Sequence, residues 1–283
     1  MTEKVPGSAV LRIVLGAKLR QLRESRGITA QQAARAIRGS DSKISRVELG
    51  RHAAREIDVV DLLALYGVTD PDERESLLTL ASQALAPPWW QRNAEVLPTW
   101  FQAYLGLEEA ADSVQSYDTH YVPGLLQTSD YAAGLLAMAE FEPGETARLM
   151  QVRADRIERF AAAGWRLEAV IDEAVLRRPV TDSAVLAGQL RHLREAASWP
   201  GVRIRIRRLA AGAPPAPAGF TILHFTAPEL PDVVYTEQLT SASYLDRPAD
   251  VSRYETVLET LRASSQPAGQ TADLIDAALS EIG

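Results

Sequence analysis

The sequence predicts a mainly α-helical chain in two parts. The first is a bundle of short helices, and the second is a larger α+β part with a small, mostly antiparallel sheet and helices. Three observations predict this: apolar residues recur at helical spacing through the first 86 residues, a strictly alternating pattern occurs over 202–207, and helical and strand patterns alternate from residue 99 onward. We therefore expect a domain over 1–86, a connector over 87–98 and a C-terminal domain over 99–283.

Composition excludes several classes of protein. The chain has 283 residues, of which 46% are hydrophobic and 24% charged, as in globular proteins. It has no cysteine, which excludes disulfide frameworks, thiolate nucleophiles and Cys-ligated metals. No apolar run approaches the roughly 20 residues of a membrane span, and residues 1–10 lack the pattern of a secretory signal. We expect a cytoplasmic protein that does not associate with membranes.

Charge is distributed unevenly along the chain. Residues 1–55 carry twelve Lys or Arg and four Asp or Glu, a net charge of +8, whereas the remaining residues carry a net −15. A basic N-terminal part on an acidic body predicts that only the N-terminal part binds a polyanion. The alternative is chance segregation of charge, so the interpretation needs a supporting motif.

The basic part resolves into short helices. An apolar stripe of Leu11, Leu15, Leu19 and Leu22 predicts the first, which Gly27 ends. A helix over 30–37 follows, capped by Thr29 with Gln32 in a capping box. A helix over 41–49 is capped by Ser40 or Asp41. Two more are expected, one over 56–66 that buries Ile57, Val60 and Leu63 or Ala64, and one over 71–86.

Two short helices joined by a glycine-containing turn indicate a helix-turn-helix, whose second helix enters the major groove of DNA. On that second helix Ile44 and Val47 point inward, leaving Ser42, Lys43 and Arg46 facing outward. We expect Lys43 and Arg46 to reach base edges or phosphates. The other candidate DNA contacts are Thr29, Gln31, Ser40, Ser42 and Arg51. Glu48 is expected to pair internally with Arg23. The alternative to a DNA-binding helix-turn-helix is an ordinary helical bundle with a solvated basic face.

Four motifs mark the N-terminal part: LRQLR at 19–23, GIT at 27–29, SDSKISRVE at 40–48 and LYGV at 65–68. With these motifs it resembles helix-turn-helix regulators of the XRE family. It is closest to the actinobacterial group with a long antitoxin-like C-terminal domain, and it implies a lambda-repressor-like fold. This chain departs from the family at Ala30, where Gln is usual, and at Arg38, where the family has its turn glycine. Either Gly39 takes the left-handed conformation here or the turn is altered.

The resemblance continues through the body. Its segments there are PGLLQT at 123–128, YA at 131–132, DEAVLRRPV at 172–180, QLRHL at 189–193 and VYTE at 234–237. Strand patterns occur at 167–172, 202–207, 220–225 and 233–237, the last two as antiparallel neighbours, and helical patterns occur at 183–198, 250–263 and 271–282. We expect the helices on one side of the sheet, and an extended connector in which Trp89 and Trp90 dock onto a neighbouring surface.

The body shows no constellation typical of catalysis, so we expect no enzyme, no cofactor and no metal. The four histidines of the chain are far apart in sequence and do not show the spacing of metal ligands; they are His52, His120, His192 and His224. Asp172 and Glu173 follow a strand and fit a helix cap better than an acid–base pair. The arginines of 202–207 are expected on a solvated face paired with acids, in preference to an anion-binding ladder.

The expected partner is double-stranded DNA, bound by a homodimer because one motif contacts too few base pairs. Half-sites about 34 Å apart are expected. The resemblance implies a further partner, a small protein encoded nearby. The first alternative is therefore an antitoxin-like protein whose main role is to bind that partner through residues 99–283. The second alternative is an enzyme with a DNA-binding head, which the sequence does not favour.

Overall fold

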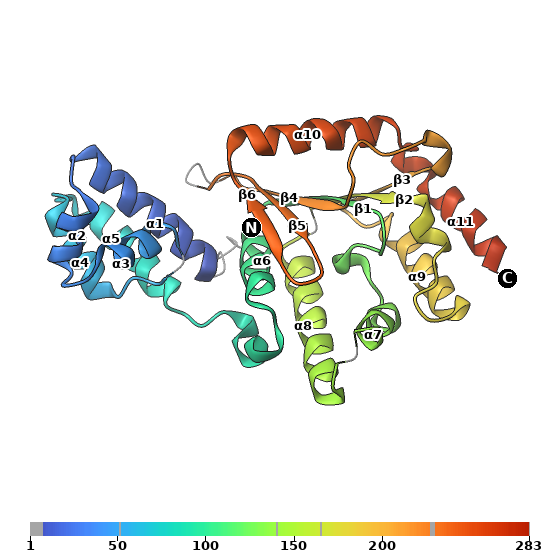
Figure 1. Ribbon diagram of the computed structural model, residues 1–283, viewed down its shortest axis with the longest axis horizontal. Coiled ribbons are helices and arrows are strands. Elements are labelled where there is room, and N and C mark those ends of the chain that lie inside the picture. Colours follow the sequence, from blue (N-terminus) through green and yellow to red (C-terminus); the bar gives the residue numbers. More distant parts are fainter. Residues whose placement is uncertain (1–7, 51, 140, 165, 227–229, 283) are drawn as a thin grey trace. The chain divides into compact units, whose positions relative to one another are not determined.

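The computed structural model describes residues 8–282, except residues 51, 140, 165 and 227–229. The chain divides into two units, one built mainly from residues up to Arg92 and the other mainly from Ala111 onward (Figure 1). The first is a helical bundle and the second combines a sheet with helices, which confirms the predicted fold class. In the described ranges, no helix has the length and apolar character needed to span a bilayer.

Five helices precede residue 85 in the described part of the chain. They are α1 (Ser8–Ser25), α2 (Ala30–Ala36), α3 (Asp41–Glu48), α4 (Glu56–Leu65) and α5 (Pro71–Ala84). Their apolar stripes share one core, in which Leu19 of α1, Ile44 and Val47 of α3 and Leu63 of α4 are almost wholly buried. The predicted helical stripes therefore converge, as amphipathic helices must to remove their apolar faces from water.

The predicted buried face of α4 is right at Leu63 and wrong at Ile57. Ile57, expected inside, is 63% exposed, and the helix instead buries Asp58, Val59 and Leu62 beside Leu63. The helix is rotated relative to the expected stripe because Asp58 is drawn inward by two cations, Lys43 and Arg55. A carboxylate that is buried with its charge satisfied can take a position that an apolar pattern would assign to the surface.

The connector also differs from the expectation. An extended segment was predicted after the two prolines, but the structure forms the 3-10 helix η1 over Trp89–Val96. Trp90 is buried and meets Trp89 edge to face at 5.4 Å between ring centroids, so the tryptophan pair does pack. The helix α6 (Thr99–Ala110) follows directly.

The second unit is organised around a six-stranded mixed sheet in the order β3-β2-β1-β4-β5-β6. Its strands are β1 (Ser113–Asp118), β2 (Leu167–Asp172), β3 (Val202–Arg207), β4 (Phe220–His224), β5 (Val233–Glu237) and β6 (Ala242–Leu245). The first three pair in parallel, whereas β1–β4, β4–β5 and β5–β6 pair antiparallel. The four predicted strands are present, and the predicted antiparallel neighbours β4 and β5 are confirmed. The sequence patterns missed β1 and β6.

Helices cover both faces of this sheet, which corrects the expectation of a single covered side. Figure 1 shows α10 (Pro248–Ala263) along one face, with α7 (Ser129–Ala137), α8 (Pro143–Ala162) and α9 (Ser183–Ala196) on the other. Under α10, Phe220, Ile222 and Val234 pack against Val251 and Leu258. The last helix, α11 (Thr271–Ile282), packs against α9 and β3. Strands with both faces covered need apolar side chains on both, as Val170 and Ile171 provide.

Two of the segments that carry the family resemblance are joined by a buried amide. The side chain of Gln189 on α9 is 0% exposed; its Nε2 donates to the Leu126 carbonyl and its Oε1 accepts from the Thr128 amide, both at 2.7 Å. Thr128 in turn caps α7 through the Tyr131 amide. One side chain therefore holds the turn before α7 against α9, and both of its polar ends are satisfied.

The arginines of β3 divide between two roles. Arg205 pairs with Glu168 on β2, which also receives Arg262 from α10, as expected for a face paired with acids. Arg207 is 2% exposed and donates from Nη2 to the carbonyl oxygens of residues 211–213, so the expectation of a solvated face is wrong there. Asp172 accepts from the Ala174 amide at the start of the 3-10 helix η3 (Glu173–Arg177), which confirms the predicted cap.

Candidate nucleic-acid interface

The α2–turn–α3 unit is fixed at both ends by local hydrogen bonds. Thr29 caps α2 in a full capping box with Gln32, and Ser40 caps α3 by accepting from the Lys43 amide at 3.2 Å. Both caps were predicted, with Ser40 selected over Asp41. On α2, Ala33 and Ala34 are buried. Their small side chains allow α3 to pack closely, so the second helix is held at a defined angle.

The turn between these helices is formed by Arg38. Its φ is 51°, the only positive φ among the described residues other than glycines, whereas Gly39 does not take the left-handed conformation. The first of the two sequence-based options, a left-handed Gly39, is therefore wrong. A side chain with a Cβ occupies the position where the resembled family has glycine, at a cost of about 1 kcal/mol. The Arg38 side chain remains exposed beside α3.

The exposed face of α3 consists of short polar side chains and one arginine. Ile44 and Val47 point into the core, and Ser42, Ser45 and Arg46 are exposed. Arg46 folds back so that its Nε donates to the Ser42 carbonyl oxygen at 3.2 Å, leaving the rest of the guanidinium to solvent. Ser45 was not among the predicted contacts, although its spacing from Ser42 places it on the same face.

The structure differs from the prediction at Lys43, which was expected to face outward. Its Nζ lies 2.7 Å from Oδ2 of Asp58, and the lysine side chain is 23% exposed. Arg55 binds the same carboxylate through Nη2 at 2.7 Å and Nε at 3.1 Å. Hydrogen bonds from Arg55 and Lys43 lower the pKa of Asp58 although burial opposes this. Lys43 thus links α3 to α4 through its ion pair with Asp58 and does not extend into solvent.

Behind α3, Glu48 pairs with Arg23 of α1, as the sequence analysis predicted. The guanidinium binds both carboxylate oxygens, with Nε 2.6 Å from Oε1 and Nη2 2.9 Å from Oε2, and Nη1 donates to the Ile28 carbonyl. This bidentate pairing raises the pKa of Arg23. The pair fixes the C-terminal end of α3, and Glu48 is therefore unavailable as a base contact.

Close backbone packing fixes α3 from the same side. At Gly16 on α1, an added Cβ would lie 2.3 Å from the Val47 carbonyl oxygen, far inside contact distance. The two helix backbones touch there without an intervening side chain, as small residues permit. Gly16 is not part of the apolar stripe that predicts α1, so the sequence pattern did not identify it as a packing residue.

The remaining predicted contacts are distributed around this surface. Gln31 is exposed on α2, Thr29 is exposed at its start and Ser40 is exposed at the start of α3. Arg51 lies outside the described residues. Two exposed arginines that the candidate set omitted, Arg35 on α2 and Arg38 in the turn, add positive charge to the same unit. The exposed face thus combines hydroxyl and amide groups with guanidinium groups, the chemistry used against phosphates and base edges.

Comparison with known families gives two matches. Residues 14–77 match the family model described as a helix-turn-helix domain. Residues 101–277 match the model described as a domain of unknown function, DUF5753. No curated protein matches the chain. No solved structure matches it either.

Proposed function

The chain belongs to the DUF5753 family and contains a helix-turn-helix domain, and we propose that it is a sequence-specific transcriptional regulator. The helix-turn-helix domain indicates a DNA-binding regulator. The proposal adds that it is of the XRE type, from the actinobacterial group with an antitoxin-like C-terminal domain. It acts in the cytoplasm on double-stranded DNA, as a homodimer and without catalytic activity.

The observation that carries the proposal is the exposed polar face of α3. Ser42, Ser45 and Arg46 stand opposite the buried Ile44 and Val47, on a helix that is capped at its start and tied down at its end. A rigid short helix with such a face suits the major groove. Arg46 is placed at base edges, where a guanidinium can bind guanine O6 and N7 together, and Ser42 and Ser45 bind adjacent bases or phosphates.

The other candidate residues have supporting roles in this proposal. Thr29, Gln31 and Ser40 contact phosphates that flank the bound groove, and Arg51 contacts the backbone beyond α3. Lys43 reaches DNA only when its ammonium leaves Asp58, from which it now lies 2.7 Å. A phosphate can compete for that ammonium, so Lys43 would contribute less affinity than Arg46.

The decisive experiment maps the chromosomal sites of the full-length protein and then measures affinity for one such site by fluorescence anisotropy. Arg46→Ala should weaken specific binding by about 1–3 kcal/mol, and Ser42→Ala by less. Arg253→Ala, which removes an exposed arginine from α10, is the control of equal charge change and should bind as the wild type does. Affinity should also fall steeply with salt because phosphate contacts release counterions.

Unchanged binding in both the Arg46 and Ser42 variants would show that α3 is not the recognition helix. A complex whose affinity hardly depends on salt would contradict an interface dominated by phosphates. The proposed dimer is tested separately: the mapped sites should contain two half-sites spaced by about one helical turn, about 34 Å, or a multiple of it.

A second candidate role, antitoxin-like binding of a small protein, is favoured by exposed apolar side chains on the C-terminal unit. Tyr121, Met138 and Phe141 are 46%, 54% and 41% exposed. Exposed side chains of this kind are typical anchors of protein interfaces. Co-expression with a short protein encoded nearby, the partner that the family resemblance implies, should give a complex that Met138→Glu disrupts and that Arg46→Ala leaves intact. A short protein that never co-purifies would remove this role.

A further inference from the structure

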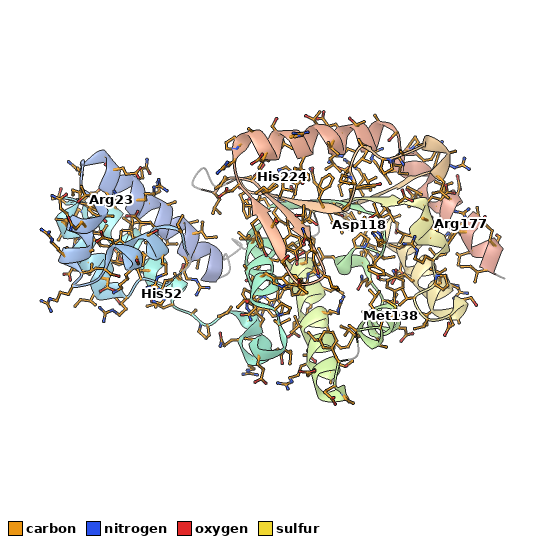
Figure 2. The ribbon with its side chains drawn as sticks, in the orientation of Figure 1. Arg23, His52, Asp118, Met138, Arg177 and His224 are labelled. Carbon is orange, nitrogen blue, oxygen red and sulfur yellow. The ribbon has the colours of Figure 1, made fainter. Side chains whose placement is uncertain are left out.

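A small cavity lies between the start of α7 and the middle of α8 in the C-terminal unit. Its volume is about 40 Å³. The residues that line it include Gln127, Thr128, Met150, Arg153 and Ile157. Figure 2 labels Met138 at the C-terminal end of α7, and the cavity lies at the opposite end of this helix. A space of this size holds about three water molecules or one carboxylate group.

Arg153 brings a positive charge to the wall of this cavity. Its Nη1 donates to Oε1 of Gln127 at 2.6 Å, and Nε2 of Gln127 is itself fixed by the Val122 carbonyl oxygen at 2.7 Å. Within the described residues, no carboxylate lies at ion-pair distance from Arg153, and Gln127 is the one group that it binds. A neutral amide therefore occupies one guanidinium nitrogen, and the remaining N–H groups keep their capacity to donate.

Another arginine of the same unit shows how such a charge is compensated inside this fold. Arg207 is more deeply buried, and its Nη2 donates to three backbone carbonyl oxygens. Arg153 lacks a set of this kind. Burial, together with the charge of Arg156, lowers the pKa of Arg153 to about 10, and Glu237 offsets this only in part. The cavity is therefore bordered by a cation that the chain compensates incompletely.

Two further features make the surroundings of Arg153 favourable to an anion. Gly124 also lines the cavity, and a Cβ added there would lie 2.7 Å from Nη1 of Arg156, so a second guanidinium borders the same region. The helix α7 begins at the cavity as well. The side chain of Thr128 caps it, and the backbone N–H of Ser129 has no acceptor within the helix. Both the second guanidinium and the helix start add positive potential.

We propose that this cavity binds the carboxylate group of a small aliphatic acid, with Arg153 as the anchor. A planar carboxylate can accept two parallel hydrogen bonds from one guanidinium, and its size fits the space. The apolar lining residues Ala132, Met150 and Ile157 suit a short hydrocarbon chain. Gln127 is a positioning residue, because its amide holds the guanidinium at the cavity wall. The site lies wholly in the C-terminal unit, so this inference does not depend on the proposed DNA binding.

The sequence analysis did not single out Arg153, because α8 carries four arginines at similar spacing. They are Arg148, Arg153, Arg156 and Arg159. The sequence pattern does not show which of them meets the turn before α7. Only the packing of α7 beside α8 brings Arg153 to Gln127 and encloses the cavity.

The test measures binding of sodium butyrate to the full-length protein by NMR, with thermal unfolding followed in parallel. We expect one site per chain, about millimolar affinity for a ligand of this size, and a Tm that rises as butyrate is added. Butyramide has the same shape without the charge and should not bind. Arg153→Lys keeps the charge but loses the planar fork, so it should weaken butyrate binding about 10-fold or more. Arg153→Met should abolish it.

Matched variants separate this site from general binding of anions. Arg253→Met removes an exposed arginine from α10, on the other face of the sheet, and should bind butyrate like the wild type. Ala154→Leu narrows the cavity and leaves Arg153 in place, so it should also weaken binding. Because residue 154 is exposed on α8, this variant should fold even where a change at Arg153 does not.

Three results would overturn the proposal. The first is a wild type that neither binds butyrate nor gains in Tm. The second is equal binding of butyrate and butyramide, or an equal rise in Tm with sodium chloride at the same concentration, which would show a salt effect only. The third is butyrate binding that is unchanged in both Arg153→Lys and Ala154→Leu, which would place the ligand elsewhere.

Discussion

Arg23 and Glu48 lie 25 residues apart in the chain, yet two guanidinium nitrogens bind two carboxylate oxygens at 2.6 and 2.9 Å. The pair connects α1 to the end of α3, the helix that we propose enters the major groove. Both side chains are largely buried, at 12% and 8% exposed. The orientation of α3 therefore depends on an ion pair that is separate from the exposed residues Ser42, Ser45 and Arg46.

Glu48→Gln should lower the free energy of unfolding by about 2–3 kcal/mol, because it leaves the Arg23 guanidinium buried without its counter-charge. Urea denaturation at pH 7 measures this. Asp276→Asn is the matched control: Asp276 also pairs with an arginine, Arg194, but both side chains are about half exposed, so little change is expected. Equal losses in the two variants would contradict the buried role of Glu48.

Asp58 should make the stability of the N-terminal unit sensitive to acid. Its pKa lies below the ordinary value of 3.8 in the folded state, so its contribution is present above that value and is lost as the pH falls through the folded pKa. Asp58→Asn should cost about 2 kcal/mol at pH 7, and the difference from wild type should shrink below about pH 4. Urea midpoints across pH 2–7 test it; a difference independent of pH would count against the ion-pair explanation.

Arg38 offers a gain in stability. Arg38→Gly should raise the free energy of unfolding by about 1 kcal/mol, since glycine takes a positive φ without steric cost. Arg38→Ala removes the same guanidinium but keeps a Cβ, so it should bring no such gain. If both variants shift the thermal unfolding midpoint alike, the backbone conformation is not the cause.

Replacing Gly16 by alanine should change stability in the direction opposite to that predicted by helix propensity. Gly16→Ala should destabilise the protein by about 3 kcal/mol, because the new methyl group overlaps the Val47 carbonyl oxygen and pushes α1 away from α3. Gly188→Ala in α9, where no atom lies within 4 Å of the new Cβ, should instead stabilise by about 0.5–1 kcal/mol. Chemical denaturation of both variants gives the comparison; a stable Gly16→Ala protein would show that the helices separate easily.

The features that the sequence predicted correctly are local in origin. Thr29 and Gln32 form their capping box three residues apart, Ser40 caps α3 and Asp172 caps η3, all through contacts between near neighbours. The stripe of α1 also follows from helical periodicity. Arg23 and Glu48 are the exception, a long-range pair that was expected because Glu48 was interpreted as an internal residue and not as a base contact.

The features that were missed depend on tertiary contacts. β1 places the polar Ser116 at a buried position, which breaks the apolar alternation that would identify a strand. Asp58 resembles an ordinary first-turn acid of a helix until Lys43 and Arg55 enclose it. His224 meets Asp232 only when β4 pairs with β5, and it meets Glu255 only when α10 packs on the sheet. Sequence patterns show which residues are apolar, but they do not show which polar side chains come into contact in the folded protein.

The strand order of the sheet has a consequence for biosynthesis. Central strand β1 pairs with β2 on one side and with β4 on the other, and the partners of Val114 are Leu167 and Leu223. The sheet can close only after the ribosome has released most of the chain, because such distant pairings cannot form earlier. The N-terminal helices pack on one another within residues 8–84 and can fold while synthesis continues. A nascent chain should thus carry a finished helix-turn-helix for some time before its second unit exists, and chaperones would meet the β-strands rather than the helices.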